Sequence, residues 1–203
     1  MNNNQTIYIV DDDPDVLDAM SMLLQSTGLT TKTHHSGQDF LDNNIPLLIG
    51  CVILDVRMPN MSGLQLQLDI KRKNPTLPVV FVTGHGDVPM AVQAMKNGAI
   101  EFLQKPFRDQ EFIDCVHRAL YINNLATNER EHLRSIQDRI DSLTKREHQI
   151  MRHIADGDMT KIIANKLNIS PRTVEIHRAR AMEKMRVKTV AQLVHIVMES
   201  EAQ

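Results

Sequence analysis

Ile7-Tyr8-Ile9-Val10-Asp11-Asp12-Asp13-Pro14 is the stretch that decides the fold of the first half of the chain. It joins a four-residue apolar run, typical of a short buried strand, to a cluster of carboxylates. Continuous apolar runs of this kind favour strands that are buried on both faces of a sheet. Further runs predict strands, the first two strongly and the last two more weakly, at Cys51–Leu54, Val79–Val82, Thr30–His34 and Phe102–Leu103.

Amphipathic stretches separate these runs, near residues 14–27, 36–43, 63–73, 87–97 and 109–124. A strand followed by a helix therefore recurs five times, which predicts a parallel sheet covered by helices on both faces. We expect this α/β domain to occupy residues 1–122.

The second half of the chain has no strand pattern. Residues 123–142 are predicted to form a linker helix whose apolar positions, spaced 3, 4 and 3, are Leu133, Ile136, Ile140 and Leu143. That spacing suits either a dimer seam or packing against a domain, and we favour packing.

Four short helices are predicted within residues 143–203. Thr144 and Glu147 have the spacing of a capping box at the start of the first, and Gly157 ends it. The second runs from about 159 to 167, Ser170 caps the third, and the fourth covers about 189–199. This part is therefore predicted to be a small all-α domain.

The two halves differ in charge. The whole chain of 203 residues carries 23 basic and 25 acidic residues, a net charge of −2. Residues 1–120 hold 9 basic and 14 acidic residues, a net of −5, whereas residues 121–203 hold 14 and 11, a net of +3. An acidic half joined to a basic half predicts two domains with different partners.

The composition also bears on where the protein works. Its two cysteines, Cys51 and Cys115, lie in apolar stretches, which excludes a disulfide scaffold and suits a reducing cytosol. No apolar run approaches the ~18 residues that a membrane span needs, and the opening residues lack the pattern of a signal peptide. We expect a cytoplasmic protein without membrane contact.

Polar side chains follow four of the predicted strands at the edge where such sheets bind ligands. They are Asp11, Asp12 and Asp13, then Asp55, Thr83 and Lys105. Clustered carboxylates select hard cations such as Mg²⁺, and a carboxylate can form an aspartyl-phosphate. An ammonium or hydroxyl group can bind phosphoryl oxygens. Any one of these residues could be a cap or a loop residue, Asp13 above all, but their coincidence at four strand ends favours a functional site.

The motifs at this edge resemble the receiver domain of two-component response regulators. They are VDDDP at 10–14, LDVRMP at 54–59, SG at 62–63, TGHGD at 83–87 and KPF at 105–107. The resemblance covers residues 5–120 and implies a flavodoxin-like (βα)5 fold. It also implies that a sensor histidine kinase phosphorylates Asp55.

The same resemblance implies roles for neighbouring residues. Mg²⁺ would be bound by Asp12, Asp55 and the Arg57 carbonyl, with Asp11 contributing through water. Thr83 and Lys105 would respond to the phosphoryl group, and Phe102 occupies the position of the aromatic switch residue. Gly84 stands where the family commonly has alanine, which leaves the path to Asp55 open. We interpret His85 as a loop residue with a mild effect on dephosphorylation.

The helix that begins at Ser170 has two different faces. One is predicted to pack inward, through Val174, His177, Ala181 and Met185, with His177 as a packed residue and not a metal ligand. The opposite face offers groups that can read bases in a major groove: Arg172, Glu175, Ile176 and Ala179. Contacts to phosphates are expected from Lys161, Arg178, Arg180, Lys184 and Lys188 and from backbone amides at the helix starts at Ser170 and near Thr160. Thr173 is a further predicted DNA-binding residue. The alternative is an exposed helix whose basic residues are only solvated.

Three motifs of this half resemble the LuxR-type helix-turn-helix: LTKRE at 143–147, IIANKL at 162–167 and SPRTVEIH at 170–177. Joined to a receiver, they make the chain similar to the FixJ/NarL class of response regulators, with a receiver at 1–122, a linker helix at 123–142 and a DNA-binding domain at 143–203. Within that class the FixJ-like branch is the most similar. The resemblance implies a transcription activator that binds double-stranded DNA as a homodimer after phosphorylation and acts on RNA polymerase.

Our prediction is therefore a transcription factor controlled by phosphorylation, with residues 87–104 as the surface that rearranges. A constitutive DNA-binding protein is the first alternative, and the intact acceptor set, Asp11, Asp12, Asp55, Thr83 and Lys105, speaks against it. A phosphatase-type enzyme with Asp55 as nucleophile is the second, and the chain lacks a cap or substrate-pocket sequence for it. We expect that this protein is not an enzyme.

Overall fold

The computed structural model describes residues 5–84 and 87–201. They divide into two compact units, residues 1–128 and 129–203. The boundaries predicted from the sequence, at 122 and 142, stay predictions. Each unit has its own apolar core and is described by itself.

The N-terminal unit contains a parallel sheet in the order β2-β1-β3-β4-β5, as the alternation of strands and helices predicts. Its strands are β1 (Thr6–Val10), β2 (Thr30–His34), β3 (Gly50–Leu54), β4 (Val79–Thr83) and β5 (Glu101–Gln104). The connecting helices are α1 (Pro14–Ser26), α2 (Gly37–Leu41), the short 3₁₀ helix η1 (Ile45–Leu47), α3 (Gly63–Lys73), α4 (Val88–Lys96) and the first part of α5 (Asp109–Asp141). Of these, only η1 is not predicted by the sequence pattern.

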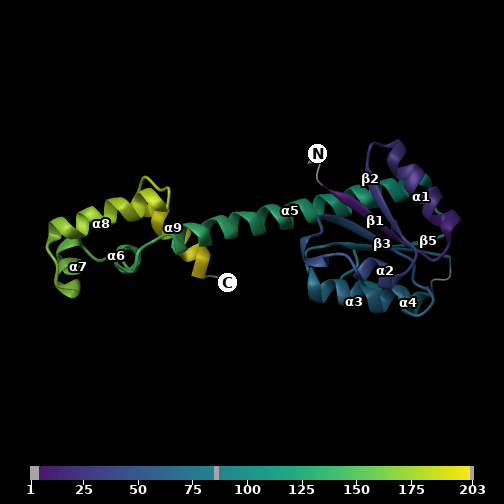
Figure 1. The fold of residues 1–203 in the computed structure, drawn as a ribbon, viewed down its shortest axis with the longest axis horizontal. Helices are drawn as coiled ribbons and strands as arrows, with labels where there is room; N and C mark the ends of the chain where they lie inside the picture. The colour runs from purple at the N-terminus through teal and green to yellow at the C-terminus, as the bar shows by residue number, and fades with distance from the viewer. Residues whose placement is uncertain (1–4, 85–86, 202–203) are drawn as a thin grey trace. The chain divides into compact units, whose positions relative to one another are not determined.

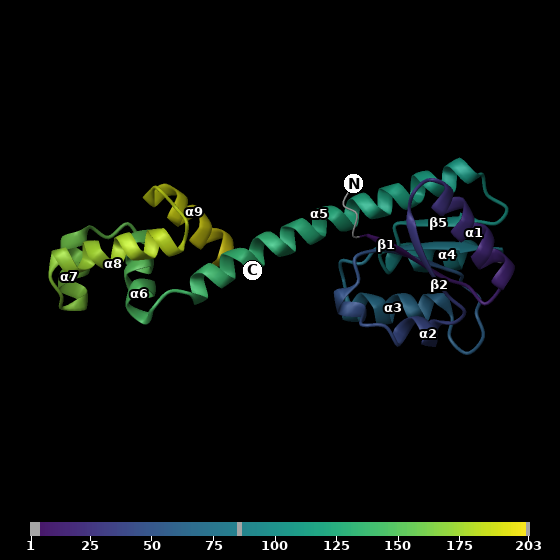
Figure 2. The same ribbon diagram turned by 45° about the horizontal axis from the view of Figure 1, so that its top comes forward.

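Helices cover both faces of this sheet (Figures 1 and 2). On one face, α1 and α5 pack against β1, β3 and β4 through residues such as Leu17, Ile53 and Phe112. On the other, η1 and helices α2, α3 and α4 enclose a second core around Phe40, Leu54 and Leu66. The central strands are therefore buried on both sides, which explains their unbroken apolar runs.

Side-chain caps begin most of these helices. Asp13, Ser36, Ser62 and Asp87 each accept a hydrogen bond from a backbone amide in the first turn of α1, α2, α3 and α4 respectively. The predicted role of Asp13 as a cap is thus confirmed. Each cap satisfies an amide that would otherwise lack a partner at the helix start.

Helix α5 runs from Asp109 to Asp141 without interruption, whereas the sequence pattern suggests an amphipathic helix to about 124 and a separate linker helix. Neither glycine nor proline occurs between these residues, so nothing in the chain ends the helix earlier. Its last apolar residue, Ile140, and Leu143 just beyond its end lie against the core of the C-terminal unit. That contact agrees with packing as the role of these two residues.

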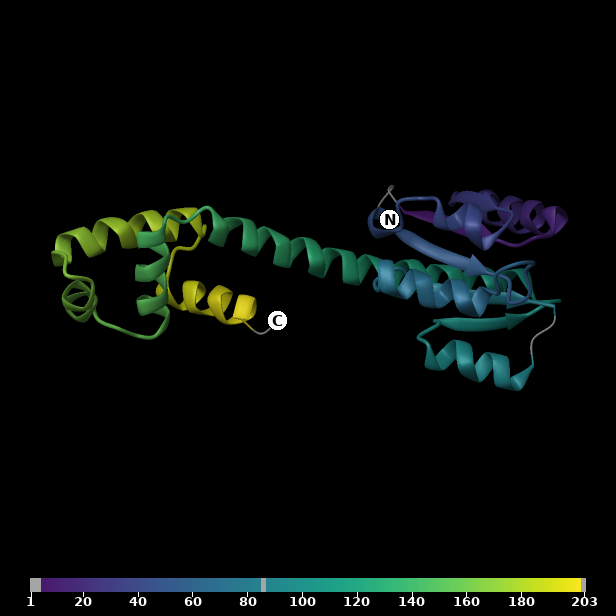
Figure 3. The same cartoon turned by 60° about the horizontal axis from the view of Figure 1, so that its bottom comes forward.

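The C-terminal unit continues with α6 (Lys145–Ala155), α7 (Thr160–Leu167), α8 (Pro171–Lys184) and α9 (Val190–Glu201). Helix α6 lies between α8 and α9 (Figure 3). The predicted capping box is present, since Glu147 N–H donates to Thr144 Oγ1 and Thr144 N–H donates to Glu147 Oε2. Ser170 caps α8. The core of the unit gathers apolar side chains from every helix, including Ile150, Ile163, Val174, Met185 and Leu193.

Candidate functional site

The carboxyl ends of β1 and β3 lie side by side and bring two carboxylates together. Val10 pairs with Leu54 in the parallel register, and Asp55 N–H donates to the Val10 carbonyl at 2.9 Å. Asp11 and Asp55 therefore leave neighbouring strands at the same level. Both side chains are buried, at 2% and 8% exposure, which makes their charges costly unless a cation is close.

Lys105 supplies that cation from the end of β5. Its Nζ lies 2.7 Å from Asp11 Oδ2 and 3.7 Å from Asp55 Oδ1. Lys105 N–H donates to the Thr83 carbonyl at 2.9 Å, which positions this residue beside β4. One ammonium is thus shared by two buried carboxylates and leaves a net negative charge.

Asp55 also accepts hydrogen bonds. The Arg57 amide donates to its Oδ2 at 2.5 Å, and the Thr83 side chain forms a further hydrogen bond with it. Burial raises the pKa of Asp55 above its ordinary value, the Arg57 amide opposes that rise, the charge of Asp11 adds to it, and Lys105 and Thr83 also oppose it. Lys105 and Thr83 face the carboxylate from the ends of two other strands, as the sequence predicts, whereas the Arg57 amide follows β3 as Asp55 itself does.

The start of α3 lies directly against the backbone of Asp55. A Cβ on Gly63 would lie 2.1 Å from the Asp55 carbonyl oxygen, so only glycine permits this approach. Gly63 belongs to the SG motif at 62–63, which by itself predicts no role for this glycine. Such a close contact between residues 8 positions apart cannot be derived from the sequence pattern alone.

The predicted metal ligands are only partly gathered. Asp11 and Asp55 converge, whereas Asp12 is exposed, and among the described residues no three His, Cys, Asp or Glu side chains could together hold a metal ion. Mg²⁺ usually takes one or two carboxylates and keeps several waters. Two buried carboxylates that share one ammonium fit this requirement.

The remaining predicted receiver residues have mixed positions. Phe102 on β5 is half-buried, and its ring lies 6.0 Å from that of Phe81 between centroids. A Cβ on Gly84 would meet nothing within 4 Å. His85, for which we predict an effect on dephosphorylation, lies outside the described residues.

The two faces of α8 are arranged as the helical spacing predicts. Val174, Ala181 and Met185 are fully buried, while His177 is half-buried with its Nδ1 enclosed. The residues of the predicted base-reading face are exposed: Arg172, Glu175, Ile176 and Ala179. Ile176 retains 46% of its surface although it is apolar.

A hydrogen bond that the sequence pattern does not indicate joins α7 to α8. Thr160 Oγ1 at the start of α7 donates to Glu175 Oε1 at 2.6 Å. Arg178 Nη1 lies 3.6 Å from the same oxygen. These contacts orient Glu175, one of the predicted base-reading residues.

The predicted phosphate contacts differ among themselves. Lys161, Ser170, Arg180 and Lys188 are exposed, and Thr173 and Arg178 are half-buried. Lys184 is different: its Nζ donates to Glu147 Oε2 at 2.6 Å and to the Ser142 carbonyl at 3.0 Å. Its ammonium is bonded within the unit, which gives it a stabilising role, and its phosphate contact stays a prediction. The spacing of α8 cannot reveal this partner because Glu147 lies on α6.

Glu147 is the ion-pair partner of Lys184. It is buried and accepts from both the Lys184 ammonium and the Thr144 amide. These bonds lower the pKa of Glu147 to about 2, the lysine contributing most. Glu147 thus joins the start of α6 to the end of α8.

Comparisons with known proteins agree with both halves of this description. Residues 7–117 match the model of the response regulator receiver domain, and residues 141–197 match that of bacterial regulatory proteins of the luxR family. No helix within the described ranges is long and apolar enough to cross a membrane.

Several relatives match the chain over nearly its whole length. The chain is 40% identical over 200 residues to the transcriptional regulatory protein TdiR of Thauera aromatica, covering 98% of this chain and 88% of TdiR. It is 38% identical over 200 residues to the transcriptional regulatory protein FixJ of Bradyrhizobium diazoefficiens, covering 98% of both. The structure of the response regulator StyR matches with a TM-score of 0.90 at 40% identity, covering 97% of this chain and 99% of StyR.

TdiR and FixJ are both named as transcriptional regulatory proteins. The chain covers most of their length, with the buried carboxylates Asp11 and Asp55 in the matched receiver and helix α8 in the matched luxR segment. The chain therefore belongs to the two-component response regulators that combine a receiver domain with a LuxR-type DNA-binding domain.

Proposed function

We propose that phosphorylation of Asp55 switches this chain into a dimeric transcription activator. The observation that carries the proposal is the meeting of Asp55 with Lys105, Asp11 and Thr83 at one sheet edge. A carboxylate oxygen of Asp55 attacks the phosphorus of a phosphohistidine on a sensor kinase. The P–N bond breaks, its electron pair stays on the imidazole, and an acyl phosphate forms on Asp55.

The chain's own residues prepare this transfer. The Arg57 amide orients Asp55 Oδ2, while Lys105 lies near Oδ1, where it can pair with a phosphoryl oxygen. Mg²⁺ would be held by Asp12, Asp55 and the Arg57 carbonyl, with Asp11 acting through water. When bound, it would neutralise the charge that gathers between the carboxylates and the phosphoryl group.

The response would spread from Thr83 to α4 and β5. Thr83 already touches Asp55, and an added phosphoryl group offers its hydroxyl new acceptors. Among the described residues of α4, only Ala94 is buried, so moving this helix disrupts little apolar packing. Phe102 on the adjacent strand is half-buried and is placed to change exposure with it.

Dimerisation would then align two copies of α8 on two half-sites of double-stranded DNA. Arg172, Glu175, Ile176 and Ala179 would contact bases. Phosphates would be contacted by Lys161, Arg178, Arg180, Lys188 and the α8 start at Ser170 and Thr173. In this account the protein works in the cytoplasm, and the bound dimer contacts RNA polymerase.

The decisive experiment compares wild type, Asp55→Asn and the control Asp18→Asn, in which an exposed carboxylate on α1 is changed. Each is treated with acetyl phosphate and Mg²⁺. Mass spectrometry measures phosphorylation, light scattering measures mass, and binding is measured to a duplex selected by the phosphorylated protein. We expect phosphorylation, dimerisation and tighter DNA binding in wild type and in the control only. Equal binding with and without the phosphoryl donor would refute the switch.

The DNA face is tested through its salt dependence. Lys161→Gln should weaken binding to all duplexes and lower the slope of log K against log salt by about 1, the value for one lost phosphate contact. Ile176→Ala should instead lower the preference for the selected duplex and leave the slope unchanged. If Ile176→Ala leaves sequence preference intact, α8 does not read bases through this residue.

A further inference from the structure

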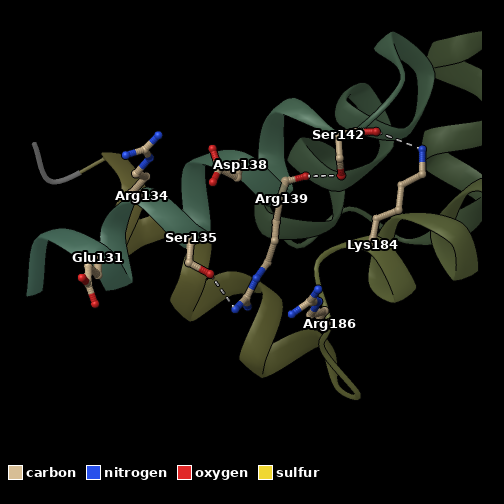
Figure 4. Close-up of a pocket in the computed structure, with 8 residues that line it drawn as sticks. All are labelled: Glu131, Arg134, Ser135, Asp138, Arg139, Ser142, Lys184 and Arg186. Carbon is tan, nitrogen blue, oxygen red and sulfur yellow. Dashed lines mark hydrogen bonds between the residues drawn. The ribbon is translucent and has the colours of Figure 1, made fainter. Parts of the chain in front are cut away.

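A hollow of about 390 Å³ lies within the C-terminal unit. One wall is the end of α5, from Glu131 to Ser142, and the other is the end of α8 with the turn that follows it, through Lys184 and Arg186. Figure 4 shows side chains from both walls around this space. No role has so far been assigned to it.

Basic side chains dominate its lining. Arg134, Arg139, Lys184 and Arg186 face two carboxylates, Glu131 and Asp138. Lys184 is already neutralised by Glu147 at 2.6 Å. Within the described residues, neither Glu131 nor Asp138 forms an ion pair with the three arginines, so their charges are not compensated by direct contact.

Two hydrogen bonds orient the guanidinium group of Arg139. Its Nη2 donates to Ser135 Oγ at 3.1 Å, and its Nη1 reaches the Met185 carbonyl at 3.5 Å. Its Nε is buried, without a hydrogen-bond partner. Figure 4 shows this side chain extending toward Arg186. A guanidinium that two contacts hold in place can offer the remaining N–H groups of its Nη atoms to an oxygen-rich anion.

Arg186 occupies an unfavourable backbone position. It follows the C-cap of α8, Met185, with a φ of 55°. This left-handed position normally favours glycine or asparagine, because a Cβ there is strained. The guanidinium of Arg186, like that of Arg134, has no partner within the described part of the chain. A strained arginine at the rim indicates that its side chain has a use.

We propose that this hollow is a phosphate-binding pocket. Planar guanidinium groups bind phosphate oxygens in a bidentate manner, and Arg139 and Arg186 come from opposite walls. The hollow has room for a phosphate group together with what it is attached to. That phosphate belongs either to a small phosphorylated molecule or to the DNA backbone, and in both cases it joins the end of α5 to the end of α8.

The first arm of the test uses the full-length protein without DNA, and so does not depend on the proposed function. Pyrophosphate is titrated at constant ionic strength, and the arginine Nε–H signals are followed by NMR. The variants are Arg186→Gln and Arg139→Lys, with Arg130→Gln as the control, since Arg130 is exposed on α5 and does not line the hollow. If the ligand is a free phosphate compound, pyrophosphate binds wild type and the control with the same affinity. It then binds the two variants at least tenfold more weakly.

The second arm measures the salt dependence of duplex binding. If the source is the DNA backbone, Arg186→Gln lowers the slope of log K against log salt by about 1 and Arg130→Gln does not. Arg186→Gly separates a binding role from a structural one, because it relieves the backbone strain: we expect a higher melting temperature together with weaker phosphate binding. If neither variant changes either pyrophosphate affinity or the salt slope, the pocket is refuted.

Discussion

Asp55 in the N-terminal unit and Glu147 in the C-terminal unit are both buried carboxylates beside a lysine, yet their pKa values move in opposite directions. Lys184 lies 2.6 Å from Glu147, and the Thr144 amide adds a second bond, so the pKa of Glu147 falls to about 2. Lys105 is 3.7 Å from Asp55 and closer to Asp11. Burial therefore dominates, and the pKa of Asp55 rises.

The difference separates a structural carboxylate from a reactive one. Glu147 has its charge fully matched, which stabilises the joint between α6 and α8 and leaves it chemically inert. Asp55 shares one cation with a second carboxylate, so its site keeps a negative charge that a divalent cation can relieve. Functional sites commonly retain such unfavourable arrangements at a cost in stability.

The largest effect is expected from Lys184→Met. This change leaves the Glu147 carboxylate without its cation, although the residue is only 3% exposed. Breaking a buried ion pair in this way costs about 3–5 kcal/mol. Urea unfolding followed by helical circular dichroism should show early loss of the C-terminal unit. Lys188→Met, at an exposed position, should change stability by less than about 0.5 kcal/mol. Equal behaviour of the two variants would mean that the pair contributes nothing.

The pH dependence of the C-terminal unit should follow Glu147. Its folded-state pKa of about 2 lies below the ordinary value of 4.5, so its stabilising effect is complete above about pH 5 and disappears as the pH falls toward 2. The shift corresponds to about 3 kcal/mol. Glu147→Gln should remove this part of the acid sensitivity and lower stability at pH 7. The difference between the unfolding free energies of wild type and Glu147→Gln should shrink steadily as the pH is lowered from 7 to 2.

Asp55→Asn should act with the opposite sign. Because the folded-state pKa of Asp55 is raised, ionisation destabilises the receiver as the pH rises above the ordinary carboxyl range. In buffer containing EDTA at pH 7, the variant should be more stable by about 0.5–2 kcal/mol, and the gain should vanish in acid. Tyrosine fluorescence reports this unit selectively, since both tyrosines, Tyr8 and Tyr121, lie in it. Mg²⁺ should narrow the gap by binding wild type; a less stable variant would contradict our account of Asp55.

The contrast also marks how far the sequence could predict the site. The receiver residues follow strand ends, and parallel strands bring their ends to one edge, so spacing alone predicts that Asp11, Asp55, Thr83 and Lys105 meet. The exposed face of α8 follows from helical spacing in the same way. Both predictions rest on local patterns repeated along the chain.

Pairings between distant helices could not be predicted. Lys184 and Glu147 are 37 residues apart, and which cation meets which carboxylate depends on how α6 packs against α8. The approach of Gly63 to the Asp55 backbone is another contact of this kind. The unbroken course of α5 could have been expected from its lack of glycine and proline, but the change from an apolar to a polar face suggested a boundary.

The smallest effect is expected from a change at Thr144, which tests whether the low pKa of Glu147 depends on the Thr144 hydroxyl. Thr144→Ala removes the hydroxyl that accepts from the Glu147 amide, while the Thr144 backbone amide still donates to the carboxylate. Loss of such a cap costs about 1 kcal/mol, and Thr144→Ser should retain most of it. Because Lys184 stays in place, we expect the acid sensitivity between pH 5 and 2 to persist in Thr144→Ala, measured by circular dichroism in urea. Loss of that sensitivity would show that the hydroxyl, and not the lysine, holds the pKa of Glu147 low.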